Sequence, residues 1–238
     1  MKRYLKLSSV IVLCSIFILS FTSCSDDDDY SLDKYWESIV TVNKIGDNTY
    51  DFTLDNGEKL WVAAPAGLSL KPDYKRAIIN YTILSDETGE YAHWIRLNAF
   101  YDVLTKKPIY IAEDDEAKQD SIGNDPVKIH SIWEGGGYLN IHFGYNAGGR
   151  NAHMLNLISA DPELSAGDEV VKLEFRHNQK NDPQDYSRRG YVSFDLEPYR
   201  IEGRDKVIFE ISVKEFSGET KVYTIEYKYE LEDQQEEG

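Results

Sequence analysis

The sequence predicts an all-β protein, in which a small five-stranded OB-like barrel is followed by a seven-stranded β-sandwich. Three observations lead to this prediction. Apolar and polar residues alternate along most of the chain after residue 35, as they do in half-buried strands. Clusters of Gly, Asn, Asp and Pro separate the alternating runs. The same region contains no convincing run with the period of a helix, so the alternating runs are best explained as strands of two β domains.

The barrel is predicted in residues 35–105. The hairpin signal Asn56-Gly57 connects its second and third strands, because both residue types tolerate a positive φ. The fifth strand is the longest, and five strands within about 70 residues fit a small barrel. The predicted strands are Trp36–Asn43, Tyr50–Leu54, Lys59–Ala63, Ala77–Leu84 and Tyr91–Val103.

The sandwich is predicted in residues 127–232, after an acidic linker at 106–126 that contains the run Glu113–Glu116. Residues 233–238 are expected to form a frayed acidic tail. Gly-rich and Asp-Pro turns separate seven short runs of alternating residues, which is typical of a sandwich. The predicted strands are Val127–Trp133, Tyr138–Tyr145, His153–Ser159, Glu169–His177, Gly190–Leu196, Lys206–Lys214 and Lys221–Leu231.

The charge of the chain argues against a nucleic-acid partner. The chain has 26 Lys and Arg against 42 Asp and Glu, for a formal net charge of −16. Binding to phosphates requires clustered basic residues, which this composition does not favour. Only two cysteines are present, so a framework of several disulfides is excluded.

Residues 1–23 are predicted to be a signal peptide. Lys2, Arg3 and Lys6 precede an apolar stretch from Val10 to Phe21. That stretch is shorter than the roughly 20 apolar residues that a membrane-spanning helix needs, and its length fits the apolar region of a signal peptide. Removal of this segment would leave 23 basic and 42 acidic residues, a formal charge of −19.

The end of the apolar stretch, Phe21-Thr22-Ser23-Cys24, resembles the lipobox of bacterial lipoproteins. The resemblance implies that Cys24 becomes the first residue of the mature chain and carries acyl chains that hold it to a membrane. Two or more chains give stable anchoring. The departure from the motif is Phe21, where Leu is most frequent. The alternative is a plain secretory signal that leaves Cys24 as an unmodified thiol.

An acidic tether is predicted at residues 24–34. The residues that follow Cys24 are Ser25, Asp26, Asp27, Asp28 and Asp29. This sequence is similar to the export tag that Bacteroidetes lipoproteins use to reach the outer leaflet of the outer membrane, so we expect a surface-exposed lipoprotein. The alternative is a simple solvated acidic tether, and the two interpretations are compatible.

The order of segments resembles the NigD-like family of Bacteroidetes lipoproteins. After the lipoprotein signal come YDFTLDNGEKLWVAAP and RAIINYTILSD, then NAFYDVLTK, an acidic connector and IWEGGGYLNIHFGY. The resemblance covers nearly the whole mature chain and implies an N-terminal OB-like domain with a C-terminal β-sandwich. It brings no catalytic motif with it. The family name implies a link to bacteriocins by gene proximity alone.

The sequence points to no enzyme, because the common hydrolase, phosphate-binding and metal-binding motifs are absent from it. No catalytic residue, cofactor or metal site is predicted. His142 and His153 flank one predicted hairpin and could approach each other, but no third ligand can be named. The remaining hypothesis of an enzyme is a hydrolase without a recognisable motif.

Aromatic and basic residues supply the candidate binding site. Trp94, Arg96, Asn98 and Phe100 alternate along the fifth strand and are expected to share one face, where they could stack on a sugar ring. The alternative is that this stripe packs against the second domain. Trp133 lies near the start of a turn that contains three glycines. It either forms the edge of a shallow ligand site or packs as an anchor in the core.

The sequence therefore favours a lipid-anchored, non-catalytic module that binds a protein or glycan partner at the cell surface. Its rivals are a bacteriocin-associated immunity or accessory protein and an accessory protein for glycan handling.

Overall fold

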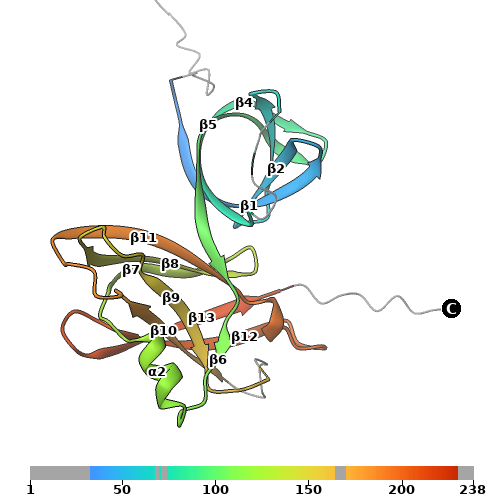
Figure 1. Cartoon of the computed structure of the whole chain (residues 1–238). Helices are drawn as coiled ribbons and strands as arrows, with labels where there is room; N and C mark the ends of the chain where they lie inside the picture. Colours follow the sequence, from blue (N-terminus) through green and yellow to red (C-terminus); the bar gives the residue numbers. More distant parts are fainter. Residues whose placement is uncertain (1–32, 68–69, 71–73, 164–169, 230–238) are drawn as a thin grey trace, which may run out of the picture.

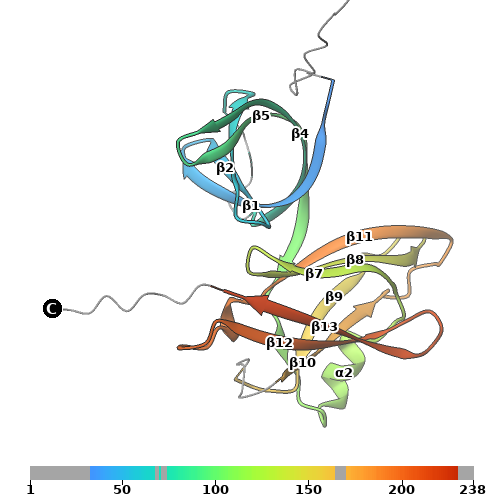
Figure 2. The same ribbon diagram turned by 180° about the vertical axis from the view of Figure 1, so that it is seen from behind.

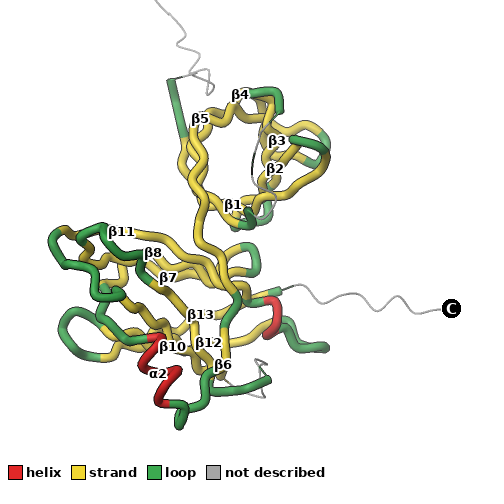
Figure 3. Tube along the Cα trace, viewed as in Figure 1, coloured by secondary structure: helices red, strands yellow, loops and turns green. Residues whose placement is uncertain are grey.

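The computed structural model describes residues 33–67, 70, 74–163 and 170–229, and these form a barrel followed by a sandwich (Figures 1 and 3). The predicted all-β class and the order of the two domains are confirmed. The predicted signal peptide, Cys24 and the acidic export tag lie outside the described residues. Within the described part of the chain, no helix is both long and apolar enough to cross a membrane.

The barrel has the five predicted strands, in the order β3-β2-β1-β4-β5. Neighbours in this order are antiparallel, and a parallel pairing of β3 with β5 closes the barrel. Each strand contributes a fully buried apolar side chain to the core: Val40, Phe52, Leu60, Ile79 and Ile95. The strands are β1 Trp36–Gly46, β2 Thr49–Leu54, β3 Lys59–Ala64, β4 Arg76–Thr88 and β5 Tyr91–Lys106.

A β-bulge in β5 overturns one sequence-based prediction. Asn80 pairs with Ala99 and Tyr81 pairs with Leu97, so Asn98 is an extra residue that reverses the alternation. Phe100 therefore lies opposite the buried Ile79 and packs against the barrel core. The expected single face of Trp94, Arg96, Asn98 and Phe100 is wrong for Phe100, because a period of two cannot reveal an inserted residue.

The sandwich consists of two sheets that enclose a second apolar core. One sheet contains β11, β8 and β7, and the other has the order β13-β12-β10-β9-β6. The described residues therefore contain eight strands here, one more than predicted, because β6 adds a short edge strand. The strands are β6 Ile109–Tyr110, β7 Lys128–Gly135, β8 Tyr138–Ala147, β9 Met154–Ser159, β10 Val170–Asn178, β11 Tyr186–Asp195, β12 Lys206–Lys214 and β13 Thr220–Lys228.

Residues 106–126, which we expected to form a linker, contribute to the sandwich. Strand β6 pairs in parallel with β9, and Ile111 is buried. The short helix α2, Glu116–Ile122, begins where the Asp115 carboxylate accepts the backbone N–H of Lys118. Arg176 on β10 donates to the side-chain oxygen of Gln119 in this helix. Acidic composition indicated exposure here, but the few apolar residues are enough to dock the segment.

Strand β5 joins the two domains. It begins in the barrel, and its last residues pair in parallel with β11 of the sandwich, as in Val192 with Leu104. A single eight-stranded sheet therefore runs from β3 to β7 through both domains. Figures 1 and 2 show β5 descending from the barrel to the sandwich.

A buried polar network fixes the barrel on the sandwich. The fully buried Arg76 of the barrel donates to Asp55 at 2.5 Å, to Thr41 at 2.9 Å and to Asn140 of the sandwich at 3.2 Å. The indole N–H of Trp133, on β7, donates to Asp55 at 2.9 Å. Trp133 therefore anchors the domain junction. We call these five residues the junction network.

The glycine turn after Trp133 makes this close approach possible. A Cβ added to Gly135 would lie 2.6 Å from the Cβ of Asp55, which is closer than real Cβ contacts allow. Asp55 cannot swing away, because Arg76 and Trp133 hold its carboxylate. The sequence marked Gly135-Gly136-Gly137 as a turn, and the structure adds a steric requirement for the first of these glycines.

The steric argument predicts non-additive stability effects. Gly135→Ala should lower the free energy of unfolding by about 1–3 kcal/mol, the usual cost of overpacking. In an Asp55→Gly background, which removes the Cβ together with the carboxylate, the added methyl group has room, so the cost of Gly135→Ala should fall below about 1 kcal/mol. Urea denaturation of the four proteins measures both costs. Gly46→Ala is the control, since its Cβ would meet only ordinary contacts with Thr49. Equal costs of Gly135→Ala in both backgrounds would refute the steric coupling.

Candidate functional site

The four residues that the sequence proposed for binding do not come together. Trp94 has 38% of its surface exposed on the barrel, and Arg96 donates to Asn98 and Thr82 of the same domain. Phe100 lies against the barrel core, and Trp133 lies in the junction network. No common site forms from this set.

A cleft of about 520 Å³ in the sandwich is a stronger candidate. It lies where β8 and β11 of one sheet face β9 and β10 of the other. We call it the histidine cleft, after His153 and His177 in its lining. Its lining residues are Leu104, Phe143, Tyr145, Ala147, Gly149, Asn151, Ala152, His153, Leu155, His177, Asp182, Arg188, Arg189, Gly190 and Tyr191.

One wall of the histidine cleft is a loop that is organised around Asp182. The buried Asp182 carboxylate accepts four consecutive backbone N–H groups, from Gly148, Gly149, Arg150 and Asn151, at 2.6–2.9 Å. Burial alone would raise the pKa of Asp182, but the four N–H groups outweigh it and hold the pKa well below its usual range. A permanently charged Asp182 therefore keeps residues 148–151 in one conformation.

Two histidines extend this arrangement. The Nε2 of His153 lies 3.3 Å from Asp182, and its Nδ1 lies 2.8 Å from the Nε2 of His177. Because ionised Asp182 only accepts, Nε2 of His153 carries a proton. When His153 carries no second proton, its Nδ1 accepts the Nε2–H of His177. The Nδ1 of His177 is buried with no hydrogen-bond partner among the described residues.

Burial lowers the pKa of His177 to about 4, and the neighbouring His153 adds to this effect. The charge of Asp125 and the backbone of Asp125 and Pro126 act in the opposite direction without overcoming it. His177 is therefore neutral at physiological pH.

Aromatic rings form the rest of the inner surface. Tyr145 meets His153 edge to face, with ring centroids 5.0 Å apart, and Phe143 lies beside Tyr145 at 5.4 Å. Gly190 pairs with Phe143 across the strands, and the rings of Phe143 and Tyr145 pack close to it, at 3.3 and 3.5 Å from the position of an added Cβ. Arg188 pairs with Tyr145 and is exposed. The cleft thus combines an aromatic floor with fixed polar groups and a cationic rim, as ligand sites do.

The sequence did not pair the correct histidines. His142, which we considered as a neighbour of His153, stacks instead on Tyr191 at 4.2 Å and lies 4.8 Å from His130. A usable signal existed for His177, because it continues the buried alternation of Leu173 and Phe175. The sequence pattern gave no indication that Asp182 lies near His177, since Asn181-Asp182-Pro183 predicted only a turn of the chain.

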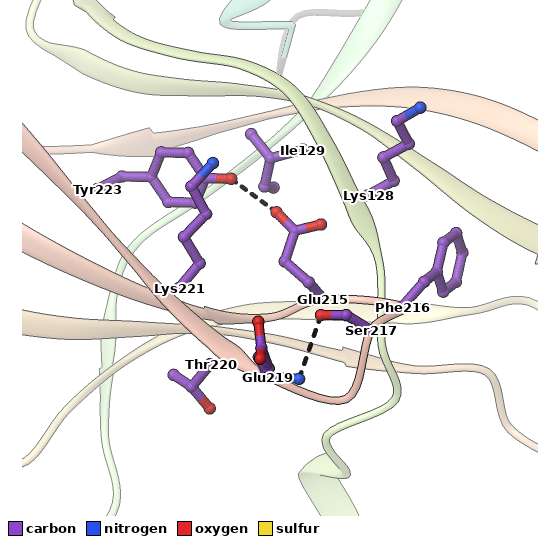
Figure 4. A pocket seen from close by; sticks show the side chains of 9 residues that line it. All are labelled: Lys128, Ile129, Glu215, Phe216, Ser217, Glu219, Thr220, Lys221 and Tyr223. Atoms are coloured by element: carbon purple, nitrogen blue, oxygen red, sulfur yellow. Dashed lines mark hydrogen bonds between the residues drawn. The ribbon is translucent and has the colours of Figure 1, made fainter.

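A second hollow, of about 490 Å³, lies at the β12–β13 hairpin (Figure 4). Its polar groups largely serve the hairpin itself. The hydroxyl of Tyr223 donates to Glu215 at 2.6 Å, and the backbone N–H of Glu219 donates to Ser217. Burial and the bond to Glu215 raise the pKa of Tyr223. This hollow therefore offers fewer unused groups than the histidine cleft.

The lowered pKa of His177 predicts a stability loss in mild acid. The unfolded chain takes up this proton near pH 6.5 and the folded chain only near pH 4, so stability falls as the pH drops through this window. The loss should reach roughly 3 kcal/mol. Denaturation across pH 4–7 should show a flatter profile for His177→Gln, whereas the exposed-site control His130→Gln should keep the wild-type slope. Parallel profiles for wild type and His177→Gln would contradict this assignment.

Comparisons with solved structures reveal relatives over most of the chain. A protein from Parabacteroides distasonis described as "TOXIN related" is 34% identical, covers 82% of this chain and 94% of its own, and has a TM-score of 0.69. A protein of unknown function from Bacteroides vulgatus is 31% identical, with coverages of 84% and 93% and a TM-score of 0.67. A NigD-like immunity protein from Bacteroides caccae is 24% identical, with coverages of 84% and 100% and a TM-score of 0.65, and shows the same fold.

Among curated proteins, none matches the chain. Two family models match it in succession: the NigD-like N-terminal OB domain over residues 39–103 and the NigD-like C-terminal β-sandwich domain over residues 110–227. Together these models span more than half of the sequence and agree with the observed barrel and sandwich. The chain belongs to the NigD-like family.

Proposed function

We propose that this protein is a lipid-anchored, non-catalytic binding protein of the outer cell surface, and that the histidine cleft receives its partner. The observation that carries the proposal is the cleft itself, with its aromatic floor and its Asp182-ordered wall. None of the described residues that line it is Ser, Thr or Cys. Among the lining residues, the hydrogen-bonded His153 and His177 therefore have no Ser, Thr or Cys nucleophile beside them to activate. Rigid polar groups around an apolar floor favour recognition over catalysis.

The proposed anchor rests on the sequence around Cys24. A basic start, a short apolar stretch and small residues before the cysteine together support lipidation, and the following acidic residues support export to the surface. In this arrangement the barrel lies nearer to the membrane along the chain, and the sandwich with its cleft follows it. The partner in this proposal is a protein or glycan at the cell surface.

Protection against a bacteriocin is a second candidate function. The observation in its favour is the name of the relative from Bacteroides caccae, a NigD-like immunity protein with the same fold. In this case the partner of the cleft would be a toxin, and the protein would again act by binding its partner without catalysis.

Cys24→Ala tests the anchor. The substitution removes the only nucleophile that can take the lipid, so the protein should move from the membrane fraction to the soluble fraction and lose label from radioactive palmitate. Cys14→Ala is the matched control, because this cysteine lies inside the predicted signal peptide and should not matter. A Cys24→Ala protein that stays in the membrane fraction after its signal peptide has been cleaved would refute lipid anchoring. Digestion of intact cells with a protease should remove the wild-type protein, and its survival beside cleaved surface markers would refute surface exposure.

Deletion of the gene separates the two candidate functions. If the protein confers immunity, the deletion strain should become at least tenfold more sensitive to the cognate bacteriocin, and expression of the intact gene should restore resistance. The measurement is the minimal inhibitory concentration. Unchanged sensitivity would reject immunity and leave the general binding function in place.

A further inference from the structure

One half of β11 has a free edge above the histidine cleft. β11 pairs with β8 along its whole length, from Tyr186 to Asp195, but it pairs with β5 only from Val192 to Phe194. Among the described residues, no recorded strand pairing covers the opposite edge of residues 186–190, which we call the β11 edge. Figures 1 and 2 show β11 continuing past the point where β5 turns into the barrel. Unpaired N–H and C=O groups on such an edge are a template for another strand.

The β11 edge is positively charged in a strongly acidic chain. Arg188 and Arg189 are adjacent and exposed, and Arg150 is exposed on the loop that Asp182 orders. No ion pair recorded for the described residues includes any of these three guanidinium groups. The guanidinium of Arg188 instead lies over the ring of Tyr186, at 5.9 Å. Three uncompensated cations favour an anionic occupant.

The cleft beneath the edge is suited to an apolar side chain. Side chains of an added strand would point alternately into the cleft and away from it. On the cleft side they would meet Tyr145, which packs beside the buried Phe143. Leu104, at the point where β5 leaves the edge, is 47% exposed and extends this apolar surface. On the other side they would lie near Arg189.

We propose that the β11 edge and the histidine cleft bind an extended acidic peptide segment, which adds to the sandwich as a strand and inserts an apolar side chain into the cleft. This proposal rests on the proposed binding function and names its partner class. A second copy of the same chain fits poorly, because two β11 edges would bring Arg188 and Arg189 of one chain against the same residues of the other. An acidic segment pairs with this edge without that repulsion.

The test uses two synthetic seven-residue peptides, each with a fluorescent label. Glutamate and valine alternate in the first, and lysine replaces glutamate in the second. Fluorescence anisotropy measures their binding to the full-length protein in a non-ionic detergent. The glutamate peptide should bind saturably and weaken at least fivefold between 50 and 300 mM salt. The lysine peptide should bind at least tenfold more weakly.

Three variants locate the binding surface. Combined Arg188→Glu and Arg189→Glu should weaken binding of the glutamate peptide at least tenfold, and Ala152→Trp should do so by filling the mouth of the cleft. Lys172→Glu, at an exposed position on β10 outside the cleft, should stay within twofold of wild type. All four substituted positions are exposed, so circular dichroism should confirm that the variants are folded.

Several results would overturn the proposal. These are absence of saturable binding up to millimolar peptide, equal binding of both peptides, or unchanged binding in the edge and cleft variants. Sedimentation that shows a dimer lost in the Arg188→Glu and Arg189→Glu protein would assign the edge to a second copy and also reject it. If the peptide fails but wild-type cells still bind a surface partner that Ala152→Trp cells lose, only the peptide assignment fails. If cells bind no partner at all, the binding function itself fails.

Discussion

The contact between Asp55 and Arg76 constrains the whole molecule, because it lies where the two domains meet. Arg76 is fully buried, and its two terminal NH₂ groups donate to Asp55, Thr41 and Asn140, whereas its Nε is buried with no hydrogen-bond partner among the described residues. Removal of one partner from such a buried pair typically costs about 3–5 kcal/mol. The network includes side chains from both domains, so it favours one position of the barrel on the sandwich. That position determines where β5 leaves β11, and therefore how much of the β11 edge stays open.

The histidine cleft depends on a similar principle at a smaller scale. Asp182 replaces the strand pairing that residues 148–151 lack, by accepting four of their N–H groups with one carboxylate. His153 then lies against this fixed charge, and His177 lies against His153. A pre-ordered wall reduces the entropy that a partner's binding would otherwise cost. The net negative charge of the chain also influences which partner binds. It repels an acidic partner, but salt screens this repulsion beyond roughly 8–10 Å. The arginines of the β11 edge attract the same partner at contact.

Sequence reasoning predicted the strands well, because alternation and turn residues are local properties. It identified the Asn56-Gly57 hairpin and all five barrel strands. It failed at Phe100, where a single extra residue in β5 reverses the faces, and a bulge leaves no mark on composition. Residues 106–126 were misjudged because their charges suggested full exposure, although Ile111 and helix α2 dock on the sandwich.

The candidate site was harder to predict than the fold, since its residues meet only through tertiary structure. His153 and Asp182 are 29 positions apart, and their contact depends on where β9 begins and β10 ends. Trp133 was proposed as part of a ligand site or as a core anchor, and its partner Asp55, which belongs to the other domain, was not identified. Long-range pairs of this kind require the relative placement of two domains, which no local pattern contains.

The shared strand β5 also has a mechanical consequence. A protein held at its N-terminus and gripped at its sandwich would transmit tension through β1, β4 and β5 before the load reached β11. The parallel hydrogen bonds between Leu104–Lys106 and Val192–Phe194 would then be loaded along the strands, with several bonds sharing the force. Such a shear geometry resists pulling better than a hairpin opened one bond at a time. With the proposed lipid anchor at the N-terminus, this domain order would make the barrel transmit force between the lipid bilayer and the partner that is bound to the sandwich.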